Sequence, residues 1–161
     1  MNSEPAIRKN RAAAELGAEE SRALIARGVR TMSTPRALLR AMRPLQWTKN
    51  GLVFAAMIFD RKFTDASSIG LAILAAICFC AASSATYLLN DVRDAERDRI
   101  HPKKRFRPIA SGELQQRTAL IAAGALSIAA AAAGALIRWE FAVVITGYLA
   151  LMIAYNTVLK Q

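Results

Sequence analysis

Three long apolar runs, separated by short polar segments, dominate the last two thirds of this chain. They are Ser67 to Leu89, Thr118 to Ile137 and Phe141 to Leu159, and none of them contains a charged residue. A helix of about 20 apolar residues crosses a hydrocarbon core of about 30 Å. The pattern therefore predicts three transmembrane helices.

A fourth apolar run is shorter and has a lysine near its start. Gly51 to Phe59 is too short to cross a bilayer, but extending it back to Pro44 gives sixteen residues. Such a span would need Lys49 to be buried against protein or to face an aqueous cavity, which makes this lysine a candidate functional residue. The alternative is a helix on the membrane surface with a snorkelling Lys49, and the sequence leaves both open.

The distribution of positive charge predicts the topology. Residues 1–43 hold nine Lys or Arg and residues 91–117 hold eight, against Arg61, Lys62 and Arg138 in the other two loops. Because loops rich in Lys and Arg stay in the cytoplasm, both basic segments are expected on the cytoplasmic side. Two crossings must then separate them, which favours residues 44–59 as the first of about four spans.

The composition favours a membrane protein over a nucleic-acid-binding one. The net charge is +10, but 54% of the residues are hydrophobic and the mean hydropathy is +0.23. We expect an all-α, polytopic membrane helix bundle, with small residues that allow close packing and with homo-oligomer formation left open. Residues 1–33 are expected to form a flexible basic tail without the apolar core of a signal peptide. Residues 35–42 are expected to form an amphipathic helix on an anionic leaflet.

A dense polar block, Tyr87 to Glu113, lies between two of the apolar runs. If Tyr87 to Arg99 continues the preceding helix, four of its polar residues project from one face, because successive residues turn by about 100°. These residues are Asn90, Asp91, Asp94 and Asp98.

Crowded carboxylates repel one another unless a cation lies between them. Mg²⁺ prefers such hard oxygen ligands and often completes its shell with substrate phosphates. The sequence therefore predicts a Mg²⁺ site on Asp91, Asp94 and Asp98. The alternative is a solvated helix end with salt bridges, because Arg93, Arg97 and Arg99 are interleaved with the acids.

A basic turn follows the acids directly. Pro102 and Pro108 restrict the backbone and end the helix, so the cations between them are held on a shaped turn. Arginine offers forked donors that match phosphate oxygens. An ordinary cytoplasmic loop would also be basic, but the position of this turn beside the carboxylates favours a phosphate site. The cations are Lys103, Lys104, Arg105 and Arg107.

The acidic and basic motifs together resemble the UbiA superfamily of intramembrane prenyltransferases. The acidic motif reads Asn90-Asp91-x-x-Asp94-x-x-x-Asp98-Arg99, and the basic one reads His101-Pro102-x-Lys104-Arg105-x-Arg107-Pro108-Ile109-Ala110-Ser111-Gly112. With Arg43-Pro44-x-Gln46-Trp47-x-Lys49-Asn50 upstream, they are most similar to the branch that transfers phosphoribosyl groups to polyprenyl phosphates.

This resemblance implies a reaction and a set of roles. Phosphoribosyl diphosphate would be the donor, polyprenyl phosphate the acceptor and diphosphate the leaving group, at the cytoplasmic face of a bacterial inner membrane. Asp91, Asp94 and Asp98 would be the catalytic, Mg²⁺-binding residues. The substrate-binding residues would be Lys49, Asn50, Asn90, Arg99, Lys104, Arg105, Arg107, Tyr155 and Lys160.

The chain departs from the family pattern in its length. Family members have about nine spans and a second acidic motif, as the resemblance implies. Residues 155–160 look like the segment that leads into that motif, so we expect residues 34–161 to be the N-terminal part of the domain, inactive alone. Two other readings stay open: a superfamily enzyme with an aromatic acceptor and a prenyl diphosphate donor, and a non-catalytic membrane remnant or anchor that binds anionic lipids.

Overall fold

The computed structural model describes residues 34–59, 61 and 64–156, and every regular element in these ranges is helical. The predicted tail and Lys160 lie outside the described residues. The helices are α2 (Thr34–Met42), η1 (Pro44–Leu52), α3 (Val53–Phe59), α4 (Ala66–Arg93), α5 (Ala95–Ile100), η2 (Lys104–Phe106), α6 (Gln116–Ile137) and α7 (Trp139–Ala154).

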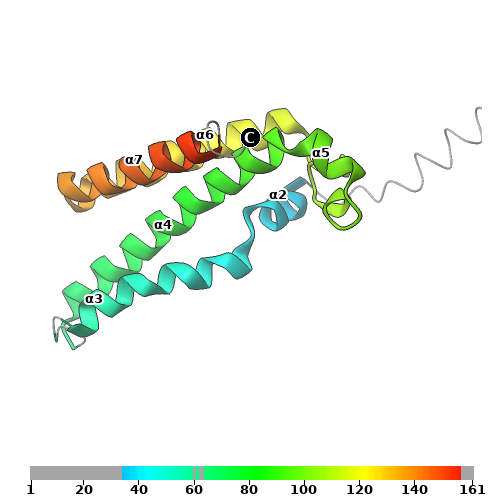
Figure 1. Ribbon diagram of the computed structural model, residues 1–161. Helices are drawn as coiled ribbons and strands as arrows, with labels where there is room; N and C mark the ends of the chain where they lie inside the picture. Colours follow the sequence, from blue (N-terminus) through cyan, green and yellow to red (C-terminus); the bar gives the residue numbers. More distant parts are fainter. Residues whose placement is uncertain (1–33, 60, 62–63, 157–161) are drawn as a thin grey trace, which may run out of the picture. The chain divides into compact units, whose positions relative to one another are not determined.

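Helix α4 is the central element of the described part. It packs against α6 and α7 on one side and against α2, η1 and α3 on the other (Figure 1). Ala82 and Ala85 of α4 and Ala119, Ala123 and Ala130 of α6 are all buried. Small side chains of this kind let membrane helices approach closely.

The turn between α6 and α7 brings a glycine close to the next helix. A Cβ on Gly134 would lie 3.4 Å from the Cα of Ala142, which is van der Waals contact, so the two backbones approach closely at this point. Helix α7 begins at Trp139, two residues after α6 ends, and runs back along its neighbour. The short connection and close contact make α6 and α7 a helical hairpin.

Two of the predicted spans are confirmed as long apolar helices. Helices α4 and α6 have 28 and 22 residues, and both are long and apolar enough to cross a membrane. Helix α7 is apolar but has 16 residues within the described part, where it ends at Ala154. The predicted class, an all-α membrane helix bundle, is confirmed.

The predicted first span is helical but changes type along its length. Residues 44–52 form a 3₁₀ helix and residues 53–59 an α-helix. A 3₁₀ helix rises about 2.0 Å per residue against 1.5 Å in an α-helix, so the two segments together reach about 28 Å. Lys49 is exposed, so it is not buried against the described part of the protein. The choice between a span in which Lys49 faces an aqueous cavity and a helix on the membrane surface stays open.

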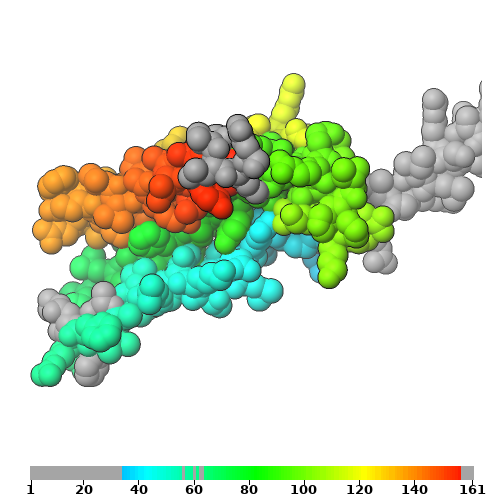
Figure 2. Space-filling model, in the orientation of Figure 1, coloured from blue at the N-terminus to red at the C-terminus, as the bar shows by residue number. Residues whose placement is uncertain are grey.

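One end of the bundle is closed by the polar loop between α5 and α6. Ile109 and Leu114 are 2% and 1% exposed, and they join the apolar core formed by α2, α4 and α6. The amide of Leu114 donates to the carbonyl of Pro108 over 2.8 Å. Gly112 supplies the positive φ of 83° that the turn requires. Figure 2 shows this loop gathered against the end of α4.

The expected continuous helix over Tyr87 to Arg99 was wrong at one residue. Helix α4 ends at Arg93 and α5 begins at Ala95, with Asp94 between them at φ −84° and ψ −1°. The amide of Asp94 still donates to the carbonyl of Asn90, and that of Asp98 to the carbonyl of Asp94. Because this i to i−4 pattern persists, the break does not rotate the acids away from one another.

Helix α2 packs on the protein through its alanines. Ala37 and Ala41 are buried in the same core as Ile109 and Leu114 of the loop. Arg40 donates to the carbonyl of Phe106 over 3.0 Å and pairs with Glu113 over 2.9 Å. Contact between helix α2 and an anionic leaflet stays a prediction.

Candidate functional site

The three aspartates of the polar block are buried on one side of the α4–α5 junction. Asp91, Asp94 and Asp98 are 2%, 5% and 2% exposed. The interleaved arginines Arg93 and Arg97 are exposed instead. The face predicted from helical spacing is therefore present, and it points into the protein rather than into solvent.

Two arginines reach this face from different parts of the chain. Arg43 donates from Nη2 to Asp91 Oδ1 over 2.6 Å. Arg107 donates from Nη1 to the same Asp91 oxygen over 3.2 Å and to Asp98 Oδ2 over 2.7 Å. Two buried carboxylates thus converge on one guanidinium nitrogen. Arg97 approaches Asp94 only to 4.0 Å.

The backbone around Arg107 explains why its side chain points inward. Arg107 is extended, with φ −65° and ψ 143°, as expected for a residue that precedes a proline. The following Pro108 and Ile109 are buried, so the chain is fixed on one side of the arginine. The predicted role of the two prolines in shaping the basic turn agrees with this geometry.

Arg43 is a member of the site that sequence reasoning missed. It lies between α2 and η1 in the left-handed region, at φ 57°, which is uncommon for a residue with a side chain. The turn brings its guanidinium to 4.8 Å from the centre of the Tyr87 ring, in a cation–π contact. The one available signal was the Arg43-Pro44 pair, since proline disfavours a helical residue before it.

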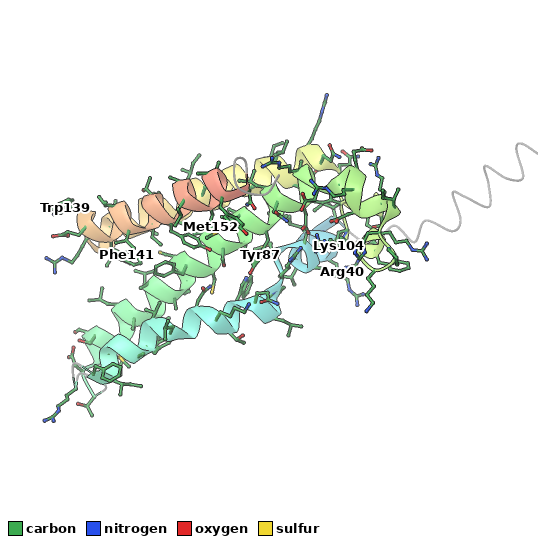
Figure 3. All side chains as sticks on the ribbon, in the orientation of Figure 1. Arg40, Tyr87, Lys104, Trp139, Phe141 and Met152 are labelled. Atoms are coloured by element: carbon green, nitrogen blue, oxygen red, sulfur yellow. The ribbon has the colours of Figure 1, made fainter. Side chains whose placement is uncertain are left out.

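A cavity of about 190 Å³ lies beside the pair of Arg43 and Asp91, between α4 and the end of α7. Tyr87 of α4 and Met152 of α7, both labelled in Figure 3, contribute to its wall. Two predicted substrate-binding residues, Asn90 and Tyr155, line its wall, although they are 65 positions apart in the sequence. The lining is Arg43, Thr86, Tyr87, Asn90, Met152, Tyr155 and Asn156.

Two predicted residues of the first span do not reach the acids. Lys49 is exposed on η1. The Asn50 amide instead contacts α4, with Nδ2 3.3 Å from the Sγ of Cys80 and 3.4 Å from the Oγ of Ser83. Asn50 therefore helps to dock η1 on α4.

The predicted cations of the loop divide into two groups. Arg107 enters the site, whereas Lys104 and Arg105 are exposed and Arg105 lies over the Phe106 ring. Arg99 pairs with Glu96 over 2.9 Å and points away from the acids. His101, the weaker candidate, accepts the amides of Lys103 and Lys104 through Nδ1 and so orders the turn.

The donor set suits a divalent metal held by two carboxylates. Among the described residues no three His, Cys, Asp or Glu side chains come together as a metal-binding group. Mg²⁺, however, is commonly bound by one or two carboxylates and completed by substrate phosphates and water. Asp91 Oδ1 and Asp98 Oδ2 both contact Arg107 Nη1, so these two carboxylates are close enough to share one cationic group.

Comparison with known proteins agrees with these motifs. Residues 51–161 match the model of the UbiA prenyltransferase family. The decaprenyl-phosphate phosphoribosyltransferase of Mycolicibacterium smegmatis is 39% identical over 131 residues, which is 77% of this chain and 40% of that protein. The Corynebacterium glutamicum protein of the same name is 51% identical over 80 residues, 48% of this chain and 24% of its own length.

A relative with a different name shares part of the same region. Nodulation protein NoeC of Azorhizobium caulinodans is 42% identical over 78 residues, covering 48% of this chain and 25% of that protein. The chain spans about two fifths of the length of the mycobacterial relatives that it matches.

Proposed function

Because this chain belongs to the UbiA prenyltransferase family, we propose that its polar site serves phosphoribosyl transfer from phosphoribosyl diphosphate to a polyprenyl phosphate. The names of the relatives support this donor and acceptor. The observation that carries the proposal is the convergence of Asp91 and Asp98 on Arg107 Nη1. Such a site can hold a metal cation beside a phosphate-binding arginine.

Members of this family generally depend on a divalent metal, and we assign Mg²⁺ to Asp91 and Asp98, with Asp94 beside them. When bound, the metal would neutralise charge that develops on the leaving diphosphate. Lys104 and Arg105 are exposed at the same loop and can bind donor phosphates as they arrive. The acceptor phosphate is already an anion, so the reaction needs no strong general base.

The cavity beside Asp91 suits an anionic substrate. Arg43, Asn90 and Tyr155 offer hydrogen-bond donors at its wall, and Met152 continues the wall with an apolar side chain. A phosphate-headed lipid requires this sequence of polar and apolar surface. In our proposal the site faces the cytoplasm at the inner membrane, where the basic loop also lies.

Donor binding tests the proposal directly. The 161-residue chain is reconstituted in lipid nanodiscs and titrated with phosphoribosyl diphosphate, with and without Mg²⁺, by calorimetry. We expect phosphoribosyl diphosphate to bind only in the presence of Mg²⁺. Asp91→Asn should weaken this binding by at least about tenfold, which corresponds to about 1.4 kcal/mol of binding free energy. Glu96→Gln is the matched control, because it removes an exposed acid that is paired with Arg99.

The other two readings give different results in the same titration. Preferential Mg²⁺-dependent binding of geranyl diphosphate would replace our proposal with an aromatic-acceptor prenyltransferase. Binding of anionic vesicles that Asp91→Asn leaves unchanged, without donor binding, would support a membrane anchor, because lipid electrostatics needs only the cations.

A further inference from the structure

Arg107 occupies the place where a cation between Asp91 and Asp98 would lie. We propose that this arginine is a resident counter-ion, which leaves the two carboxylates when a divalent metal binds and then binds a phosphate group of the metal-bound diphosphate. The inference rests on the proposed function for its ligand. It goes beyond that function because it assigns Arg107 two successive partners and predicts that the arginine competes with the metal.

The distances make competition unavoidable. Arg107 Nη1 is 2.7 Å from Asp98 Oδ2 and 3.2 Å from Asp91 Oδ1. Asp91 and Asp98 would be the residues that hold the metal, and their oxygens already contact this nitrogen, so the metal would compete with the guanidinium for the same two carboxylates. The guanidinium and the metal therefore exclude each other at this position.

The electrostatics explain why a counter-ion is present. Asp91 and Asp98 are each 2% exposed, and buried like charges are unfavourable without a cation between them. Within the described residues, Arg107 is the one ion-pair partner of Asp98, whereas Asp91 also pairs with Arg43. The arginine thus stabilises the acids in the absence of metal.

The side chain of Arg107 can leave without moving a helix. It is 26% exposed, and it reaches the acids from a loop whose backbone is fixed by the buried Ile109. Arg43 is exposed to a similar degree, 28%, but its guanidinium also lies against the Tyr87 ring. Rotation of the Arg107 side chain alone would free its forked donors, which match the oxygens of a phosphate group.

Exchange of partners predicts effects of opposite sign when Arg107 is removed. Metal alone should bind more tightly, because its competitor is gone and the site is more negative. Metal together with diphosphate should bind more weakly, because a phosphate ligand is gone. Removing any nearby positive charge favours a cation and disfavours an anion, so the test must compare Arg107 with an arginine that does not lie between Asp91 and Asp98.

Mn²⁺ binding measured by electron paramagnetic resonance tests the proposal on the 161-residue chain in nanodiscs, with and without inorganic diphosphate. For Arg107→Gln we expect Mn²⁺ alone to bind roughly tenfold more tightly, and Mn²⁺ with diphosphate to bind roughly tenfold more weakly. Arg97→Gln is the control, because it removes the same charge from an arginine that is 70% exposed and approaches Asp94 only to 4.0 Å. We expect it to change either affinity by less than about twofold.

Two results would overturn the proposal. One is weaker binding of Mn²⁺ alone by Arg107→Gln, and the other is an equal effect of Arg97→Gln. If Arg107→Gln does not fold, Arg107→Lys serves instead. Lysine keeps the charge but lacks the fork, so we expect nearly unchanged binding of Mn²⁺ alone and a loss of affinity with diphosphate. If Arg107→Lys binds Mn²⁺ with diphosphate as tightly as the parent protein does, Arg107 does not bind a phosphate group through its fork.

The test also separates this inference from the proposed function. Neither Mn²⁺ nor inorganic diphosphate depends on the identity of the transferred group. If the opposite-sign effects occur while phosphoribosyl diphosphate does not bind, the counter-ion role stands and the proposed donor fails.

Discussion

At the scale of single residues, the polar loop depends on apolar side chains. Leu114 is 1% exposed and belongs to the core that also contains Ala37 of α2 and Ala119 of α6. Its amide closes the turn at Pro108, next to Arg107. The position of a charged group is therefore set by burial a few residues away.

Leu114→Ala should destabilise the protein and loosen the site together. Truncating a buried leucine costs about 2–5 kcal/mol, so we expect a lower midpoint of thermal unfolding in detergent micelles. Leu120→Ala is the matched control, because Leu120 is 46% exposed on α6. Equal midpoints for the two variants would contradict the anchoring role of Leu114.

At the scale of elements, η1 is docked on α4 by polar contacts. The indole Nε1 of Trp47 donates to the Oγ of Ser84 over 3.0 Å, and the amide of Asn50 contacts Ser83. Hydrogen bonds between membrane helices fix their relative position where apolar packing discriminates little. This docking leads the chain through the left-handed turn at Arg43 and so helps to place its guanidinium.

Ser84→Ala should release the indole of Trp47. Leaving a donor without its acceptor costs about 1–3 kcal/mol when the group is buried, and Trp47 is partly buried. The chain has two tryptophans, so a Trp139→Phe background isolates the signal. We expect increased quenching of Trp47 fluorescence by acrylamide.

Ser127→Ala is the control for this measurement, because the Ser127 hydroxyl donates to the carbonyl of Ala123 in its own helix. If both serine variants gave the same quenching as their parent, the contact between Trp47 and Ser84 would not hold η1 in place.

At the scale of the whole molecule, the arrangement of charge assigns sides to the helix ends. The loop that contains Ser111 is basic, whereas the turn before α4, which contains Thr64, holds few cations. Segment 44–59 reaches about 28 Å, close to the hydrocarbon thickness of about 30 Å. We therefore expect residue 34 and residue 111 on the same side, and residue 64 on the other.

Cysteine labelling tests this topology. Thr34→Cys, Thr64→Cys and Ser111→Cys are made in a background in which Cys78 and Cys80 are alanine. A membrane-impermeant maleimide should label position 64 in intact cells, and positions 34 and 111 only after permeabilisation. Labelling of positions 34 and 64 on the same side would show that residues 44–59 lie on the surface rather than cross.

The sequence predicted the acidic face and the apolar helices because both follow from helical periodicity, which is local. Asp91 and Asp98 lie together for that reason, and the break at Asp94 changed little. It did not predict that Arg43 reaches Asp91, because this contact joins residues 48 positions apart through a left-handed turn. Periodicity carries no information about such a turn.

The uses of Asn50 and Leu114 were also beyond a local pattern. The motif predicts that Asn50 binds substrate, but its side-chain amide contacts α4. Hydrogen-bonding capacity alone does not distinguish substrate binding from helix docking. Leu114 stands in a charged block, where hydropathy averaged over neighbours hides a single buried residue. Roles of this kind depend on which elements are in contact in the fold, and the order of residues along the chain does not predict these contacts.

The core that holds the loop also fixes when the site can form. It joins Ala37 and Ala41 of α2, Leu88 of α4 and Ile109 of the loop to Ala123 of α6. A ribosome makes these segments in order, and contacts distant in the sequence form only after the last partner has emerged. Asp91 lies 16 positions before Arg107 in the chain, and the α6 part of this core follows both. The site is therefore complete only after α6 has packed against α4 and the loop.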